Sequence, residues 1–418
     1  MKTFERVVPL AVALGAACGG GQHGHPTCGS TAWTELTIDG QRVFVPAAAG
    51  SSTPPVVQFF AQSATPVSLE VTGLEPWQAG DSLQVVSPNV ALDVTSPDEP
   101  AAGATASTGS RVDWQRHRMI DAARGDVTWV TQSREVATPT SHYRSLVRAG
   151  AAKSFAVSDG KPATLTVELA PLAQDKQLAL HWKGMEFAAL AAQAGPDATA
   201  AAAPDIEIKA VATTIVATDP FQGSYFTDVA SLVALGPISG AADDDENVTY
   251  GDPYGSGYDE VVTATYAIPV PVPTPQGVGT VQAMMVSATP TSALAGGVIA
   301  PVVTPVQAVT IGGQPANQPR TGVGVVPTLA WTAPATGTVT GYAVTVRAIA
   351  TSATGVDIAT VATIYTPDRS LAIPCNLLTA GGSYVFTITA IAAPGQSTPT
   401  AGVVPYASAD YVTAEVSP

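Results

Sequence analysis

Short segments in which apolar and polar residues alternate recur along the chain from residue 32 onward, and Gly, Pro, Asn or Asp interrupts each of them. Strict alternation is typical of a β-strand with one buried face, and the interrupting residues favour turns. Residues 67–74, 126–132 and 163–171 are examples, and Asp39-Gly40 between two such runs predicts a hairpin. The pattern predicts an all-β fold of tandem antiparallel β-sandwich domains, with one helix over 185–195.

Charge divides the chain into regions. Residues 32–183 carry fifteen acids and twelve bases, 201–300 carry eleven acids and one base, and 301–418 carry four acids and three bases. The length of 418 residues suffices for two to four domains. We therefore predict a β-sandwich domain over 32–183, an acidic β-rich domain over 184–300 and a third domain over 301–418.

The first residues have the pattern of an export signal. Lys2 and Arg6 are followed by an apolar run over 7–17, which is too short to span a bilayer. The run ends in LGAAC, with Cys18 followed by glycines, and no later run approaches eighteen apolar residues. The pattern predicts a signal peptide over 1–17 and an exported protein.

This N-terminus resembles the signal peptide and lipobox of bacterial lipoproteins, in which the Cys is lipidated and becomes the new N-terminus. Gly15 stands where that family prefers Leu. The resemblance implies a lipid anchor on Cys18 and a flexible tether over 18–31, placing the protein in the cell envelope as an outer-membrane or cell-surface lipoprotein. The alternative is an ordinary secretory signal and an extracellular protein.

Three cysteines are too few for a disulfide scaffold in a chain of this length. If Cys18 carries lipid, Cys28 and Cys375 remain and could pair. If Cys18 is free, it could pair with Cys28 instead. The sequence leaves both pairings open.

The last region holds a series of spaced residues. Trp331 is followed by Pro334 and Gly337, and Leu378 precedes Tyr384 by six positions. This series resembles a fibronectin type III domain, although Ala380 stands where a Pro is usual. The resemblance implies a two-sheet sandwich over 301–418, with Trp331 in the core of its second strand and Tyr384 as its tyrosine corner. The whole chain is similar to exported bacterial proteins that contain such a domain.

Residues 242–260 hold seven carboxylates and no Lys or Arg. Asp243, Asp245 and Asn247 match the first three ligand positions of an EF-hand loop. Val248 stands in place of the required Gly and Tyr254 in place of the bidentate Glu, so an EF-hand is excluded. Two interpretations remain, an exposed loop or a looser calcium site, because hard cations bind several carboxylate oxygens. The candidate ligands of the calcium site are Asp243, Asp245, Glu246, Asp252 and Asp259.

A basic segment lies over 111–153, with eight Lys or Arg and four acids. It predicts either an anion-binding patch or arginines paired with neighbouring carboxylates. The acidic balance of an exported chain argues against nucleic acid as a partner. Arg124-Gly125-Asp126 is explained by a turn before a strand.

No Walker loop, G-x-S-x-G or H-E-x-x-H motif occurs, so we predict no catalytic or cofactor-binding residues. The expected function is a surface-exposed, lipid-anchored or secreted non-catalytic protein with a binding or structural role. Its partners would be the membrane, through the anchor, and a protein or glycan ligand, with calcium as the one candidate cofactor. The alternatives are an exported carbohydrate-active or other hydrolase with an accessory fibronectin type III module, and a calcium-stabilised adhesion module.

Overall fold

The computed structural model is almost entirely β-structure with one α-helix, which confirms the predicted fold class. It describes residues 33–38, 41–46, 63–88, 90–115, 117, 119–138, 141–152, 154–212, 230–274, 277–352, 355–394 and 404–418. The predicted signal peptide, tether and Cys18 lie outside these residues. Within the described part of the chain, no helix is both long and apolar enough to cross a membrane.

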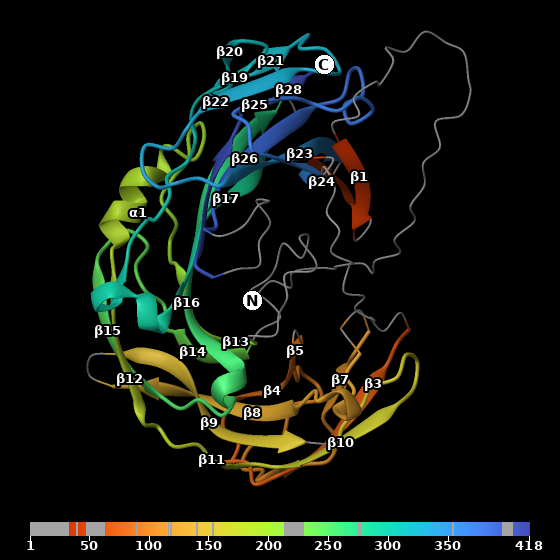
Figure 1. The fold of residues 1–418 in the computed structure, drawn as a ribbon, viewed down its shortest axis with the longest axis vertical. Coiled ribbons are helices and arrows are strands. Elements are labelled where there is room, and N and C mark those ends of the chain that lie inside the picture. Colours follow the sequence, from red (N-terminus) through yellow and green to blue (C-terminus); the bar gives the residue numbers. More distant parts are fainter. Residues whose placement is uncertain are drawn as a thin grey trace.

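One sheet, called here the long sheet, runs through the whole molecule and curves as an arc (Figure 1). Neighbouring strands along it pair antiparallel except two pairs, β24 with β2 and β21 with β28, which are parallel. In order of pairing its strands are β5 (Val90–Asp93), β4 (Ser82–Ser87), β8 (Thr128–Ala137), β9 (His142–Ala152), β14 (Ala230–Leu235), β13 (Asp205–Ala212), β16 (Tyr258–Thr274), β17 (Gly277–Pro290), β27 (Tyr406–Val412), β26 (Tyr384–Ala392), β23 (Gly341–Ser352), β24 (Gly355–Thr366), β2 (Gln41–Pro46) and β1 (Trp33–Ile38).

Short strands extend the long sheet at its sides: β11 (Ala170–Pro171) on β9, and β28 (Val416–Ser417) on β26 and on β21 (Arg320–Thr321). Ile38 pairs with Gln41 between β1 and β2, which confirms the predicted hairpin. Single 3₁₀ turns lie between strands: η1 (Ala122–Arg124), η2 (Gly255–Gly257), η3 (Thr291–Ala293) and η4 (Ala295–Gly297).

Three smaller sheets cover the long sheet. The first is β7 (Arg111–Asp113), β6 (Ala106–Ser107), β3 (Pro66–Thr72) and β10 (Ala163–Glu168); the second is β15 (Asp244–Tyr250), β12 (Lys176–Trp182) and β18 (Val298–Ile299); the third is β20 (Gln314–Pro315), β19 (Gln307–Ile311), β22 (Thr328–Thr332) and β25 (Ser370–Ala372). Figure 1 shows β12, β15, β19, β22 and helix α1 (Gly184–Ala191) on the outer side of the arc.

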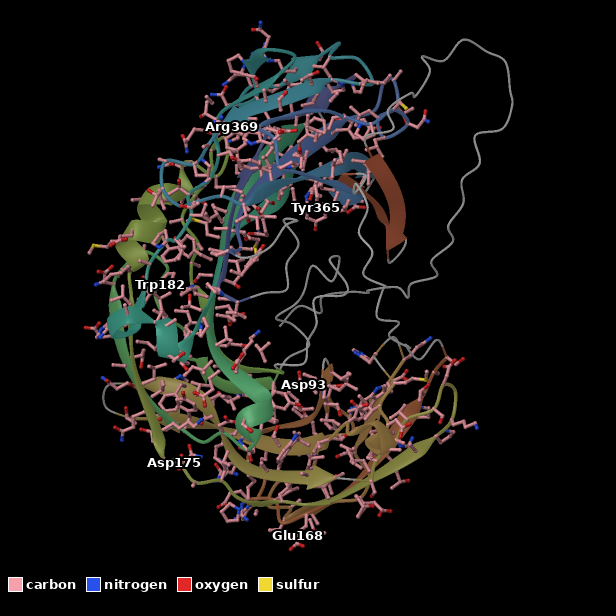
Figure 2. All side chains as sticks on the ribbon, viewed as in Figure 1. Asp93, Glu168, Asp175, Trp182, Tyr365 and Arg369 are labelled. Carbon is pink, nitrogen blue, oxygen red and sulfur yellow. The ribbon has the colours of Figure 1, made fainter. Side chains whose placement is uncertain are left out.

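The predicted helix lies at 184–191, where Phe187 stacks on Trp182 with ring centroids 4.2 Å apart. Trp182 is labelled in Figure 2. Both side chains are buried, at 3% and 2% exposure, and burial of two large aromatic rings stabilises this contact. The stack fixes the helix against the last residue of β12, the central strand of the second small sheet.

Two cores hold the layers together. A first core, with Leu69, Val85 and Leu165 among its members, lies between β3, β10 and the β4–β8 part of the long sheet. A second, larger core is one connected cluster of buried residues that includes Val86 and members from Tyr143 to Val416. The domain boundaries remain predictions. The predicted boundary between residues 183 and 184 is crossed by hydrogen bonds, because β12 of the first predicted domain pairs with β15 of the second.

The last region has two facing sheets, β19–β22–β25 and β24–β23–β26–β27. Trp331 is 5% exposed, and its ring meets Tyr342 edge to face at 5.3 Å. The hydroxyl of Tyr384 accepts a hydrogen bond from the backbone N–H of Thr379 at 2.9 Å, which is a tyrosine corner. The region is a fibronectin type III-like sandwich whose second sheet continues into β17 on one edge and β2 on the other.

Candidate binding site

Two of the five predicted calcium ligands, Asp243 and Asp245, have partners at the end of β12 and the start of α1. Asp245 lies opposite His181, with Nδ1 and Oδ1 2.6 Å apart. Asp243 accepts a hydrogen bond from Lys183 Nζ at 3.3 Å and one from the backbone N–H of Met185 at 3.1 Å. The second contact places a negative charge at the N-terminus of α1, where the helix dipole favours it.

The other three predicted ligands lie elsewhere. Glu246 is on the opposite face of β15 from Asp245, and burial together with repulsion by Asp244 raises the pKa of Glu246. Asp252 accepts a hydrogen bond from Lys176 Nζ at 3.2 Å, and its other oxygen accepts one from the backbone N–H of Tyr254. Asp259 is an exposed residue of β16.

The structure therefore does not bring the five carboxylates together. Among the described residues, no group of three or more His, Cys, Asp or Glu side chains is arranged to hold a metal ion. Residues 244–250 form the strand β15 rather than a loop, because Val248 and Tyr250 supply the alternating buried face. Calcium binding by these residues stays a prediction.

Three arginines of the basic segment, Arg134, Arg144 and Arg148, lie beside carboxylates. Arg134 binds Asp81, Arg148 binds Glu75 at 2.6 Å, and Arg144 lies 3.8 Å from Glu135. Asp126 accepts a hydrogen bond from the backbone N–H of Asp121, so its carboxylate is used within the turn. These contacts favour the interpretation of the segment as paired charges.

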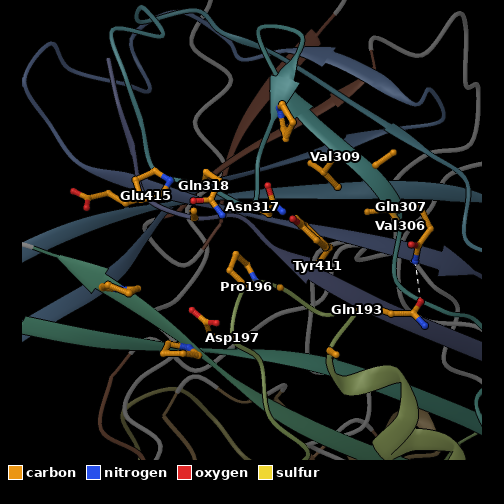
Figure 3. A pocket seen from close by; sticks show the side chains of 18 residues that line it. Gln193, Pro196, Asp197, Val306, Gln307, Val309, Asn317, Gln318, Tyr411 and Glu415 are labelled. Carbon is orange, nitrogen blue, oxygen red and sulfur yellow. Dashed lines mark hydrogen bonds between the residues drawn. The ribbon is translucent and has the colours of Figure 1, made fainter.

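A pocket of about 620 Å³ lies where the segment after α1 meets the C-terminal sandwich (Figure 3), and we call it the junction pocket. Four pieces of the chain form it: the segment after α1, the end of β16, the region of β19 and β20, and the turn from β27 to β28. Its lining residues are Ala192, Gln193, Gly195, Pro196, Asp197, Pro271, Pro273, Val306, Gln307, Ala308, Val309, Pro315, Asn317, Gln318, Pro319, Tyr411, Ala414 and Glu415.

Gly195 brings the segment after α1 close to two strands. A Cβ at this position would lie 2.8 Å from the carbonyl oxygen of Val412 and 2.9 Å from Val270 Cγ1, so only glycine fits. The Val412 N–H donates to the carbonyl of Ala194 at 2.7 Å and ties the segment to β27. Asp197 follows with φ 55°, in the left-handed region.

A β-bulge shapes the wall on the other side. The pairing of β19 with β22 shifts between Gln307 and Thr310, and Ala308 within the bulge has φ 49°. A bulge redirects side chains, here those of Gln307 and Val309, which both line the pocket. Left-handed backbone at a residue other than Gly costs free energy and concentrates at functional sites, and two of the three such residues in the described chain line this pocket.

Carboxamides are the main polar groups of the pocket. Gln307 Nε2 donates to Gln193 Oε1 at 2.9 Å and to the carbonyl of Pro305 at 3.0 Å. In Figure 3 these two glutamines lie on one side of Tyr411, while Asn317 and Gln318 lie on the other. The latter two are exposed, so their amide groups are open to solvent and to a ligand.

The charged residues of the pocket are both acids. Asp197 is exposed, and one oxygen of the half-buried Glu415 accepts a hydrogen bond from the Ser383 hydroxyl. Burial raises the pKa of the Tyr411 phenol, which stays protonated as a donor. Among the described residues that line the pocket there is no Lys, Arg or His.

Sequence reasoning missed the junction pocket, because its lining residues come from four separate segments and form no motif. It also missed the cluster around Lys176, which binds both Asp252 and Glu260. The clearest signal for the pocket in the sequence is the proline-rich end of β16, because Pro271 and Pro273 both line it.

Comparison with known proteins assigns no family: no family model matches the chain, and no curated protein matches it. The chain is similar to the crystal structure of the FN1–FN3 domains of chicken CNTN1, with 10% identity over 84% of this chain and 99% of that chain. The TM-score of 0.15 is too low for this likeness to support any conclusion.

Proposed function

We propose that the protein is an exported, non-catalytic binding protein that takes a small polar ligand into the junction pocket. Lipid on Cys18 would hold it at the cell surface; without lipid it would be secreted. The export signal and LGAAC at the N-terminus support the location.

One observation carries the binding role: the junction pocket is a preformed concavity in which converging polar side chains lie beside apolar proline and valine surfaces. Five prolines, at 196, 271, 273, 315 and 319, fix its backbone. Gly195 lets one wall approach β27 closely, and the bulge at Ala308 shapes the opposite wall. A preformed site loses little entropy on binding.

The experiment is a thermal-shift screen with a library of sugars, amines, amino acids and short peptides. A ligand that binds only the native state raises the melting temperature by mass action. Ala192 is an exposed residue of the lining, so Ala192→Trp should fill the pocket without disturbing a core. Ala200→Trp, at an exposed residue outside the lining, is the matched control.

Ligands that stabilise the wild type and Ala200→Trp but not Ala192→Trp would support the proposal. If every stabilising compound acts equally on all three proteins, or if none stabilises the wild type, the junction pocket is not a binding site and the proposal fails.

A hydrolytic role is the second candidate, because Asp197 and Glu415 both line the junction pocket and hydrolysis of glycosides uses two carboxyl groups. Against it, one oxygen of Glu415 is engaged by Ser383. Activity on aryl glycosides that disappears in both Asp197→Asn and Glu415→Gln would establish this role. Its absence in the wild type would leave the binding role.

A further inference from the structure

We propose that the junction pocket selects an uncharged polyhydroxyl ligand, a neutral sugar or a short neutral oligosaccharide. This inference rests on the proposed function, since it names the class of ligand for the same pocket. It is argued from the pocket's polar groups, its apolar surfaces and its charge.

The polar groups match hydroxyls. A sugar hydroxyl both donates and accepts, and a carboxamide offers a donor and an acceptor side by side. Gln307 Nε2 and Gln193 Oε1 are engaged, since Gln307 Nε2 donates to Gln193 Oε1 and to the Pro305 carbonyl. The other amide atoms, Gln307 Oε1 and Gln193 Nε2, have no protein partner among the described residues. Asn317 and Gln318 add two further carboxamides at the opposite rim.

The apolar surfaces match the C–H face of a sugar ring. Tyr411 is half-buried on β27, and in Figure 3 it lies between the two pairs of carboxamides. Among the described residues that line the pocket, its ring is the one aromatic surface. An aromatic ring with a polar tip supplies contact area and a hydrogen bond together, and the proline rings add rigid apolar walls.

The charge of the pocket argues against anionic ligands. Asp197 and Glu415 would repel an anionic sugar, because no described lining residue is a cation to compensate. Sites for organic cations are typically built from several aromatic rings, whereas Tyr411 is the one aromatic residue among the described residues of this lining. Carboxylates accept strong hydrogen bonds from neutral hydroxyls, so both acids fit a neutral polyol.

The test is calorimetric titration of the full chain with three kinds of probe: neutral trisaccharides (maltotriose, cellotriose, N-acetylchitotriose), an acidic one (trigalacturonic acid) and amines (choline, spermidine). The test variant is the double substitution Asn317→Ala with Gln318→Ala, at exposed positions of the lining. Gln314→Ala is the control, since Gln314 is exposed in β20 but outside the lining.

We expect at least one neutral trisaccharide to bind the wild type and Gln314→Ala equally, and the double variant at least tenfold more weakly. Tyr411→Ala should abolish this binding. Binding of the acidic sugar or an amine alone, or neutral-sugar binding that neither variant weakens, would overturn the inference. If an amine binds the wild type and Ala192→Trp blocks that binding, the inference fails but the proposed function stands. If Ala192→Trp blocks the binding of no ligand of any class, the inference and the proposed function both fail.

Discussion

Gln307 donates a hydrogen bond to Gln193 across 2.9 Å, and this contact joins two walls of the junction pocket that are more than one hundred residues apart in sequence. Gln307 belongs to the bulged end of β19, and Gln193 follows the last turn of α1. Both side chains are half-buried, so the bond is partly shielded from water.

A double-mutant cycle should therefore show coupling between these residues. We expect Gln307→Ala and Gln193→Ala each to lower the free energy of unfolding by about 0.5–1.5 kcal/mol, because each loses a hydrogen bond. The double variant should lose less than the sum. Urea denaturation measures the three values; strict additivity would show that the bond does not link the walls.

Gly195→Ala should open the junction pocket and destabilise the protein. The added Cβ would meet the Val412 carbonyl oxygen at 2.8 Å, so the segment after α1 must move away from β27. Such overpacking costs about 1–3 kcal/mol. Gly109→Ala is the control, because its Cβ would meet nothing within 4 Å. Equal melting temperatures of the two variants would contradict the close approach.

The all-β fold, the hairpin at Asp39-Gly40 and the tyrosine corner were predictable because each depends on local alternation or on short spacing. The long sheet was not, since the pairing of β17 with β27 joins residues that no local pattern relates. The acidic stretch was misjudged for a different reason. Its charges suggested a loop or a metal site, whereas Val248 and Tyr250 give it a buried face and make it a strand. The junction pocket depends on tertiary packing alone.

The pair Asp81–Arg134 should make stability depend on acid pH. Arg134 donates from Nε and NH2 to the two carboxylate oxygens at 2.8 and 2.7 Å. Burial by itself would raise the pKa of Asp81, but the hydrogen bonds from Arg134, Gln78 and Gln132 outweigh it and hold the pKa below its ordinary value. A lowered carboxyl pKa gives stability that is present above about pH 4 and is lost as pH falls through the native pKa.

Asp81→Asn should consequently lower the free energy of unfolding at pH 7 by about 3 kcal/mol, since it leaves Arg134 without its charge partner while the Asp81 side chain is only 1% exposed. The difference from wild type should shrink below about pH 4. Glu135→Gln, in a pair with Arg144 whose carboxylate side chain is 57% exposed, should cost less than about 1 kcal/mol. A pH-independent difference for Asp81→Asn would refute the assignment.

The C-terminal sandwich should fold alone, but better with its neighbouring hairpin. Residues 301–418 contain both of its facing sheets, while β17 covers the edge of β27. We expect cooperative unfolding of 301–418 and a higher melting temperature with less aggregation for 258–418, because an uncovered edge strand pairs with other chains. In either fragment, Tyr384→Phe should cost about 1–3 kcal/mol by leaving the Thr379 N–H unpaired.

The N-terminus and the C-terminal sandwich should be joined covalently. Cys375 is disulfide-bonded, and the chain has two other cysteines, Cys18 and Cys28. β2 of the N-terminal hairpin pairs with β24 of the sandwich, so Trp33, the first described residue, belongs to a hairpin attached to that sandwich. If Cys18 carries lipid, its sulfur cannot form a disulfide, and Cys28 must be the partner.

We therefore expect peptide mapping without reductant to recover a Cys28–Cys375 pair from the membrane fraction of wild-type cells. Cys18→Ser should abolish labelling by a lipid precursor and move the protein to the aqueous fraction with that pair intact. Cys28→Ser should keep the lipid, free the Cys375 thiol and lower stability by about 2–4 kcal/mol, as loss of a disulfide closing a long loop does. Recovery of a Cys18–Cys375 pair from wild-type protein would show that Cys18 carries no lipid, and the protein would then be secreted without an anchor.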